Sequence, residues 1–161
     1  MKQLILICIC FFGMQTAATA GSNKSVWIDQ LPEKARVLID THFSGIKISY
    51  AKMDKELFDT SYEVVFTNGT KIEFNRKGNW IDIECRNGIP EEIIPVEIMK
   101  FIHEHHPDLK VIKVEHDRSG YEVKLINSIE MKFDRRLRMR GYLNNLTQKV
   151  GLSLSLLRSS I

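Results

Sequence analysis

The sequence lacks the cysteines that would be needed to cross-link its fold. It contains three cysteines in 161 residues, and two of them, Cys8 and Cys10, lie in an apolar run near the N-terminus. Loss of that run on export would leave Cys85 without a partner, so an intramolecular disulfide is excluded. The fold must then be held by its core alone. This is feasible, because a domain of about 150 residues buries roughly 68–70% of its unfolded surface.

The sequence also lacks a strong charge of either sign. Its 23 lysines and arginines nearly balance 20 acidic residues, which gives a net charge of +3. Such a balance gives no case for nucleic acid or for an anionic membrane as a partner. Catalytic patterns are missing too, because there is no G-x-S-x-G, phosphate-binding loop or dinucleotide fingerprint. We therefore predict no catalytic residues and no cofactor, and interpret the chain as non-catalytic.

Long apolar runs are absent except at the N-terminus, where Lys2 precedes the run LILICICFFGM. This run is too short to cross a bilayer, which requires about 20 residues. Small residues that suit signal peptidase follow it, from Ala18 to Ala20. We predict a signal peptide over residues 1–20, cleaved after Ala20. The mature protein is then periplasmic or secreted, with no membrane insertion.

The sequence does contain an internal similarity. The stretch YEVVFTNGTKIEFNRKGNW begins at Tyr62, and YEVKLINSIEMKFDRRLRM begins 59 residues later at Tyr121. Upstream, LPEKARVLIDTHFSGIKIS from Leu31 lines up with IPVEIMKFIHEHHPDLKVI from Ile94, at an offset of 63. A spacing near 60 residues indicates two copies of one supersecondary unit.

Each copy reads as one helix followed by four strands. Pro32 and Pro95 suit the first turn of a helix, where no amide hydrogen is needed. Alternating apolar and polar residues then indicate half-buried antiparallel strands. We predict an α+β fold of two tandem repeats, each with one helix packed on a four-stranded antiparallel sheet. The expected segments are an N-terminal linker (21–30), repeat 1 (31–88), repeat 2 (89–142) and a disordered C-terminal tail (143–161).

The turns of the two copies differ in composition. In the first copy, Gly69 and Gly78 supply residues that readily adopt positive φ, as tight hairpin turns require. The second copy reads NSI from Asn127 and RRLR from Arg135, without glycine. We therefore expect its turns to be looser or of another type.

Four stretches carry a family resemblance: LPEKARVLIDTHF, KISYAKMDKELFDTSYEVVFTNGTKIEFNRKGNW, IIPVEIMKFIHEHHPDLKVIKVEHDRSGYEV and MKFD. Together they resemble the PepSY-like family of exported bacterial proteins, and the resemblance covers about Leu31 to Tyr142. The resemblance implies a fold similar to that of the β-lactamase inhibitor protein, in which two helix-plus-sheet repeats form a concave sheet. Related PepSY domains occur in peptidase propeptides, which implies binding and restraint of an enzyme.

The polar side of the strands is the candidate binding face. In the simplest interpretation it is an ordinary solvated face with cross-strand charge pairs. If the repeats join edge to edge, it becomes an extended surface that can recognise a protein by electrostatic complementarity. The resemblance favours binding, so we predict a protein partner in the cell envelope, such as an exported enzyme that is inhibited or regulated. The predicted contact residues are Glu63, Lys71, Glu73, Trp80 at the margin, Asp82, Glu122, Lys124, Glu130 and Lys132.

The histidines of HEHH, His103 to His106, suggest an alternative function. A zinc-protease helix needs histidines at i and i+4, but Pro107 occupies the position four after His103. His103 and His106 could still share one helix edge, which leaves open a small-ligand or metal carrier. Histidines near a helix C-terminus also interact favourably with the dipole, so we assign no metal ligand. Cys85 is expected to be buried as a small apolar residue.

Overall fold

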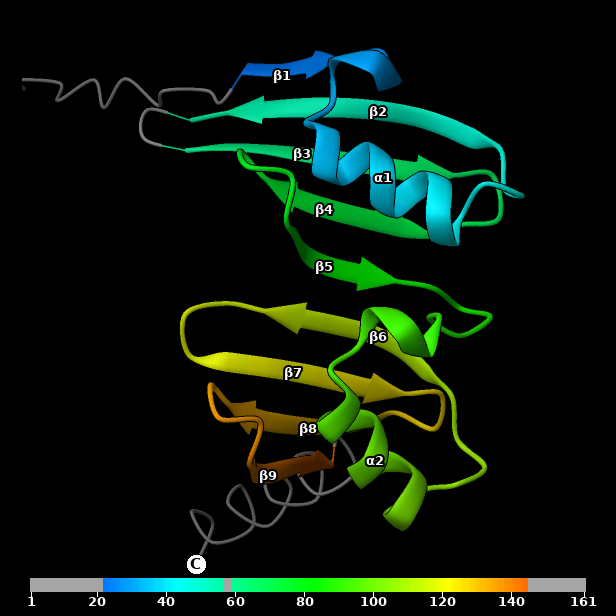
Figure 1. The fold of residues 1–161 in the computed structure, drawn as a ribbon, viewed down its shortest axis with the longest axis vertical. Helices are drawn as coiled ribbons and strands as arrows, with labels where there is room; N and C mark the ends of the chain where they lie inside the picture. The colour runs from blue at the N-terminus through cyan, green and yellow to red at the C-terminus, as the bar shows by residue number, and fades with distance from the viewer. Residues whose placement is uncertain (1–21, 57–58, 145–161) are drawn as a thin grey trace, which may run out of the picture.

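The strands of this protein form one continuous antiparallel sheet. A computed structural model describes residues 22–56 and 59–144 and contains a nine-stranded sheet in which the strands lie in chain order (Figure 1). The strands are β1 (Ser22–Ser25), β2 (Ile48–Lys55), β3 (Thr60–Phe66), β4 (Lys71–Asn75), β5 (Trp80–Glu84), β6 (Val111–His116), β7 (Gly120–Leu125), β8 (Ile129–Asp134) and β9 (Met139–Asn144).

Two α-helices cover one face of this sheet. They are α1 (Glu33–His42) and α2 (Val96–His105), and each begins directly after a proline. Two short 3-10 helices, η1 (Ile28–Gln30) and η2 (Glu91–Ile93), precede them. Figure 1 shows α1 in front of the first strands and α2 in front of the last ones. The opposite face of the sheet carries no helix in the described part of the chain.

The hydrophobic core lies between the helices and the sheet. Alternate strand residues point into it, and Val64, Ile72 and Phe74 have exposed fractions of 0%. Near the end of α1, the ring of Phe43 lies 5.4 Å from that of Phe66 in β3. Cys85 is buried, as expected, and accepts a hydrogen bond from the Thr70 hydroxyl at 3.3 Å.

The prediction of two repeats, each with a helix on its own four-stranded sheet, is wrong. Strand β5 pairs with β6, so all nine strands belong to a single sheet. At this junction Ile83 lies opposite Val114, and both side chains are fully buried. Pairing satisfies the backbone groups that two separate edges would leave open and makes the core continuous. Strand β1, which is additional to the eight predicted strands, lies in the segment predicted to be a linker.

The hairpin turns of the second half keep positive φ without glycine. Gly69 and Gly78 have φ of 84° and 78°, and Ser128 and Leu137 have φ of 68° and 59°. The expectation of another turn type is therefore not met at these positions. Gly78 also has a packing role, because a Cβ there would lie 2.7 Å from the Pro32 side chain at the start of α1.

Two predicted segments fall largely outside the described residues. The predicted signal peptide, residues 1–20, lies entirely outside them. Strand β9 continues to Asn144, and the rest of the predicted tail is not described. In the part of the chain that is described, neither helix has the length and apolar character to cross a membrane.

Candidate functional site: the polar face of the sheet

The face opposite the helices, here called the polar face, carries a line of carboxylates. Side chains of successive strands stand directly opposite one another because the register is unbroken along this line. Glu63 lies opposite Glu73, Glu73 opposite Asp82, and Asp82 opposite Glu115. Glu115 in turn lies opposite Glu122. These five residues, on five adjacent strands, form what we call the acidic row.

Lysines lie beside the acidic row and at its ends. Like charges directly opposite each other destabilise a sheet, so the row requires compensation. The Lys71 ammonium lies 2.9 Å from Glu73 and 3.9 Å from both Glu63 and Asp82. Lys113 lies 3.4 Å from Asp82 and 3.3 Å from Glu115. The acidic row is thus partly neutralised by lysines from neighbouring positions.

The same pattern continues toward both edges of the sheet. Lys52 is 3.2 Å from Glu63 at one end, and Lys132 pairs with Glu122 at the other. Beside this second pair, Lys124 contacts Glu130 at 2.9 Å. The polar face therefore carries charges of both signs from β2 to β8, with a central line of negative charge.

Asp82 is the most constrained member of the acidic row. Its side chain is only 13% exposed, and its buried Oδ1 atom has no hydrogen-bond partner among the described residues. Burial raises the pKa of Asp82, although Lys113 and Lys71 act in the opposite direction. The hydrogen bond to Glu73 raises the pKa of Lys71. A buried carboxylate oxygen without a hydrogen-bond partner carries a desolvation cost that the two lysines only partly offset.

Tyr50 adds an aromatic residue to the polar face. A register shift between Ile48 and Tyr50 in β2 places it opposite Val65, so it does not point into the core as simple alternation would suggest. Its hydroxyl donates a 3.1 Å hydrogen bond to Glu63, and its side chain is 48% exposed. Exposed tyrosines are common anchors in protein interfaces.

The structure places eight of the nine predicted contact residues on the polar face, and the exception is Trp80. A register shift in β4 puts Trp80 opposite Phe74, which is a core residue. The Trp80 ring packs against the core and lies 4.6 Å from the ring of His116. Trp80 is therefore part of the helix side of the sheet and not of the margin of the polar face.

Sequence reasoning missed several residues of this face. Lys113 and Glu115 flank the core residue Val114, so their alternation could have revealed them. Lys52 follows the buried Ala51 in the same way. Tyr50 could not be found, because a register shift leaves no mark in the pattern.

The helix-end histidines do not converge on one site. His103 Nε2 lies 3.2 Å from Glu91 Oε1, and His106 Nε2 lies 3.4 Å from the Tyr142 hydroxyl. His105 stacks on Phe101 with ring centres 4.1 Å apart. The described residues contain no group of three or more histidine, cysteine or acidic side chains placed to hold a metal ion.

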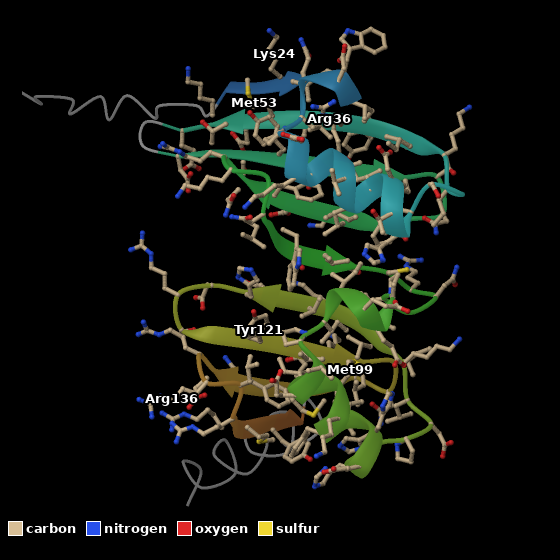
Figure 2. All side chains as sticks on the ribbon, in the orientation of Figure 1. Lys24, Arg36, Met53, Met99, Tyr121 and Arg136 are labelled. Carbon is tan, nitrogen blue, oxygen red and sulfur yellow. The ribbon has the colours of Figure 1, made fainter. Side chains whose placement is uncertain are left out.

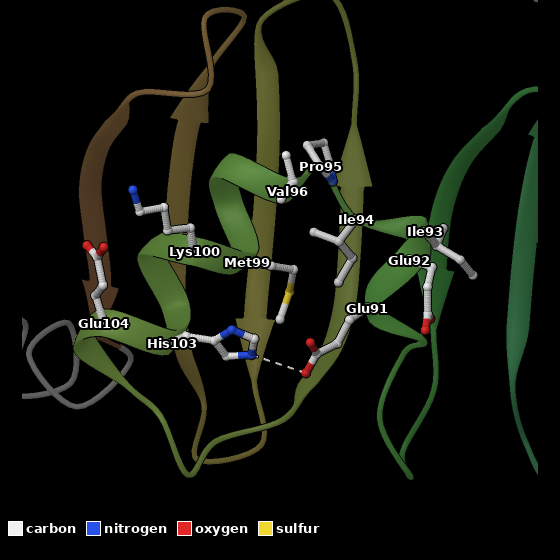
Figure 3. A pocket seen from close by; sticks show the side chains of 10 residues that line it. All are labelled: Glu91, Glu92, Ile93, Ile94, Pro95, Val96, Met99, Lys100, His103 and Glu104. Carbon is white, nitrogen blue, oxygen red and sulfur yellow. Dashed lines mark hydrogen bonds and ion pairs between the residues drawn. The ribbon is translucent and has the colours of Figure 1, made fainter.

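An open groove of about 850 Å³ lies between α2 and η2. Figure 3 shows Ile94 and Met99 between these helices, with His103 and Glu91 joined by a hydrogen bond at one side. Ile94 and Met99 are themselves buried, so the floor of the groove is part of the core. His103 lines the groove and His106 does not, so the groove does not bring together the two histidines of the carrier hypothesis.

Comparison with known proteins places the chain among exported relatives. Residues 60–140 match the family described as "Putative beta-lactamase-inhibitor-like, PepSY-like". A periplasmic protein of the DUF2874 family from Bacteroides vulgatus is 40% identical, with a TM-score of 0.75 over 78% of this chain and 99% of that one. A "putative calcium-regulated periplasmic protein" from Bacteroides thetaiotaomicron is 42% identical, with a TM-score of 0.74 over 76% and 97%.

A second B. vulgatus protein, described as periplasmic and of unknown function, is 36% identical, with a TM-score of 0.72 over 76% of this chain and 100% of that one. No functionally curated protein matches. The three relatives are periplasmic, which confirms the predicted periplasmic or secreted location.

Proposed function

The chain belongs to the PepSY-like family, and from this we propose that it is a non-catalytic periplasmic protein that binds a protein partner through the polar face. The partner is an exported enzyme that the chain inhibits or regulates. The family description, beta-lactamase-inhibitor-like, supports an inhibitory role.

The continuous acidic row is the observation that carries this proposal. A sheet that needed only a solvated face would not require five carboxylates in direct register, because each like-charged neighbour pair opposes folding. The row extends over five strands and crosses the β5–β6 junction through Asp82 and Glu115. A partner that places lysines or arginines along the row would relieve this repulsion. We therefore propose that the contact surface of the partner is basic.

The electrostatic pattern also explains how such a partner would be selected. Complementary charge accelerates association and disfavours wrong partners more than it raises affinity. Affinity requires anchors that are desolvated in the complex, and aromatic residues often serve this purpose. Tyr50 lies at one side of the acidic row and is exposed, so we propose it as an anchor.

Affinity capture with matched variants tests the proposal. The protein, Glu73→Gln/Glu115→Gln/Glu122→Gln and the control Glu33→Gln/Glu97→Gln/Glu104→Gln are each immobilised and exposed to an envelope extract of the source cell. Both variants lose three negative charges, but the control changes residues of α1 and α2. Bound proteins are identified by mass spectrometry. Isothermal titration calorimetry of each identified protein with the native chain and the two variants then gives the affinities.

The proposal predicts an envelope protein that binds the native chain and the control and is lost, by tenfold or more in affinity, from the acidic-row variant. Equal binding by both variants would remove the polar face from consideration. If the captured protein is an enzyme and its activity is the same with and without the bound chain, the result would support binding and exclude inhibition.

The carrier hypothesis has less support. His103 contacts Glu91 and His106 contacts Tyr142, so the two histidines do not converge on a shared ligand. One relative is described as calcium-regulated. The described residues of this chain do not gather three or more ligands for a metal ion, so calcium is not part of the function proposed here.

A further inference from the structure

Arginines gather at one end of the sheet, away from the polar face. Arg135, Arg136 and Arg138 lie in the β8–β9 turn, and Arg140 follows in β9. The β6–β7 loop, which carries Arg118, lies at the same end of the sheet (Figure 1). The two loops are adjacent because Gly120 of β7 pairs with Asp134 of β8. These five arginines form what we call the arginine cluster.

Four of the five arginines line an open hollow. Its volume is about 460 Å³, and its lining residues are Ser119, Asp134, Arg135, Arg136, Arg138 and Arg140. Figure 2 shows Arg136 projecting outward from the end of the sheet. Four of the six lining residues are arginines, so an anion is the ligand that the hollow fits.

The nearby acids are already engaged. The Asp134 carboxylate accepts hydrogen bonds from the backbone amides of Arg136 and Arg138, at 2.9 and 3.0 Å. It also accepts two from the Arg138 guanidinium, at 3.0 and 2.8 Å. Asp117 accepts hydrogen bonds from the Ser119 amide and hydroxyl at 2.7 and 2.6 Å.

Four arginines of the cluster form no ion pair with a described carboxylate, and they are Arg118, Arg135, Arg136 and Arg140.

The turn that carries three of the cluster residues is held in place. Leu137, at its centre, packs against the core, and the Asp134 amide donates a 2.9 Å hydrogen bond to the Arg138 carbonyl. A fixed turn presents its flanking arginines without a large loss of backbone freedom on binding.

We propose that the arginine cluster binds the phosphate groups of an anionic membrane surface, so that the protein associates peripherally with a membrane facing the periplasm. Guanidinium groups match phosphate oxygens with two parallel hydrogen bonds. Basic residues near an anionic surface attract it additively, and the attraction falls within a Debye length. The balanced overall charge of the chain conceals this local excess of arginine.

The composition of the cluster favours a lipid surface over a protein partner. Protein interfaces are anchored by exposed aromatic and apolar side chains. The large apolar side chains exposed in the described residues lie elsewhere, and they are Trp27, Val37, Tyr50, Val96, Ile126 and Tyr142. The contact is therefore electrostatic, reversible and without insertion. The proposal does not depend on the function of the polar face.

Vesicle co-sedimentation tests the proposal with the purified protein. Vesicles contain phosphatidylcholine alone or with 30% phosphatidylglycerol, in 50 mM NaCl. The test variant is Arg118→Gln/Arg135→Gln/Arg136→Gln/Arg140→Gln. The control is Arg36→Gln/Lys47→Gln/Arg86→Gln/Lys110→Gln, which removes the same charge from exposed positions outside the cluster. Circular dichroism verifies that both variants are folded.

The proposal predicts binding to the anionic vesicles, no binding to phosphatidylcholine, and release as NaCl is raised to 300 mM. Each basic residue contributes roughly a fivefold factor in partitioning. The test variant should therefore lose a hundredfold or more in vesicle partitioning, while the control should lose no more than about tenfold. Inorganic phosphate at 10 mM should leave vesicle binding nearly unchanged.

Three results would overturn the proposal. These are a native protein that fails to sediment with anionic vesicles, equal losses in the two variants, and saturable binding of inorganic phosphate without vesicle binding. Release of the native protein by salt tests the electrostatic contact even if a variant does not fold. Vesicle binding by the native protein that does not weaken as NaCl is raised would therefore also contradict the proposal.

Discussion

Leu137 adopts the backbone conformation that Gly78 adopts in the equivalent hairpin turn of the first half. Their φ angles are 59° and 78°. The Gly78 amide donates to the Asn75 carbonyl at 2.8 Å, and the Leu137 amide donates to the Asp134 carbonyl at 2.8 Å. In both turns, the side-chain oxygen of the first residue accepts bonds from the amides two and four positions later. Hydrogen bonding thus maintains a conformation that leucine alone would disfavour.

Ser128→Gly should stabilise the protein, because Ser128 occupies the left-handed region at φ 68°. Relief of this strain outweighs the greater freedom of glycine in the unfolded chain, for a gain of roughly 0.5–1 kcal/mol. Urea unfolding measures the difference. The neighbouring substitution Asn127→Gly is the control and should destabilise, since it removes the acceptor for the Ile129 amide. A Ser128→Gly variant no more stable than the native chain would contradict the argument.

Gly120→Ala should be severely destabilising. Gly120 has φ 149°, and a Cβ there would lie 1.9 Å from the Phe133 carbonyl oxygen in β8. Relief of this clash requires β7 and β8 to separate, at a cost of about 3 kcal/mol or more. Gly141→Ala is a matched control, because no atom lies within 4 Å of its Cβ position. It should change the unfolding free energy by less than about 0.5 kcal/mol. Similar losses in both variants would show that the clash is not the cause.

Ile83→Ala should weaken the whole fold and not one half of it. Ile83 is fully buried opposite Val114, at the junction of β5 and β6. Truncation of a buried isoleucine costs about 2–5 kcal/mol. Because the core is continuous, differential scanning calorimetry should show one transition before and after the substitution, at a lower temperature in the variant. Two separate transitions in the variant would indicate that the halves fold independently.

Asp82→Asn should stabilise the protein at neutral pH. Burial raises the pKa of Asp82 in the folded state, so ionisation opposes folding above that pKa and ceases to do so below the unfolded value near 3.9. The variant should be more stable than the native chain at pH 7. This difference should disappear as the pH falls to 3. Urea unfolding at both values measures it. A variant that is less stable at pH 7 would mean that attraction by Lys71 and Lys113 exceeds the effect of burial.

His103→Ala/His106→Ala should not alter the response of the protein to metal ions. His103 and His106 contact Glu91 and Tyr142, respectively, and do not share a site. Zinc, copper or nickel should therefore shift the melting temperature of the native protein and the variant by the same amount. A rise that occurs only in the native protein would restore the carrier hypothesis.

The sequence predicted the strands better than their assembly. Alternation around Val64, Ile72 and Val123 follows from burial of one face, so it identified the strands and most of the polar face. Alternation cannot reveal register shifts, and two of them moved Tyr50 onto the polar face and Trp80 away from it. These shifts depend on pairing between strands.

The pairing of β5 with β6 could not be predicted from the sequence either. An alternating strand has the same pattern at an edge as in the middle of a sheet, so Ile83 and Val114 do not reveal that they meet. The RRLR segment was interpreted only as a turn, because the grouping of its arginines with Arg118 requires the adjacency of two loops.

The order of the strands has a consequence for export. Every strand pairs only with its neighbours in the chain, from β1 to β9. A protein that enters the periplasm through a narrow pore emerges one segment at a time, and each new strand here finds its pairing partner already outside. Six of the eight pairings are hairpins with short connections, and only β1–β2 and β5–β6 enclose a helix. Local pairings form quickly. The fold can therefore assemble vectorially, with each strand templating the next, and it needs no distant segment to complete any pair.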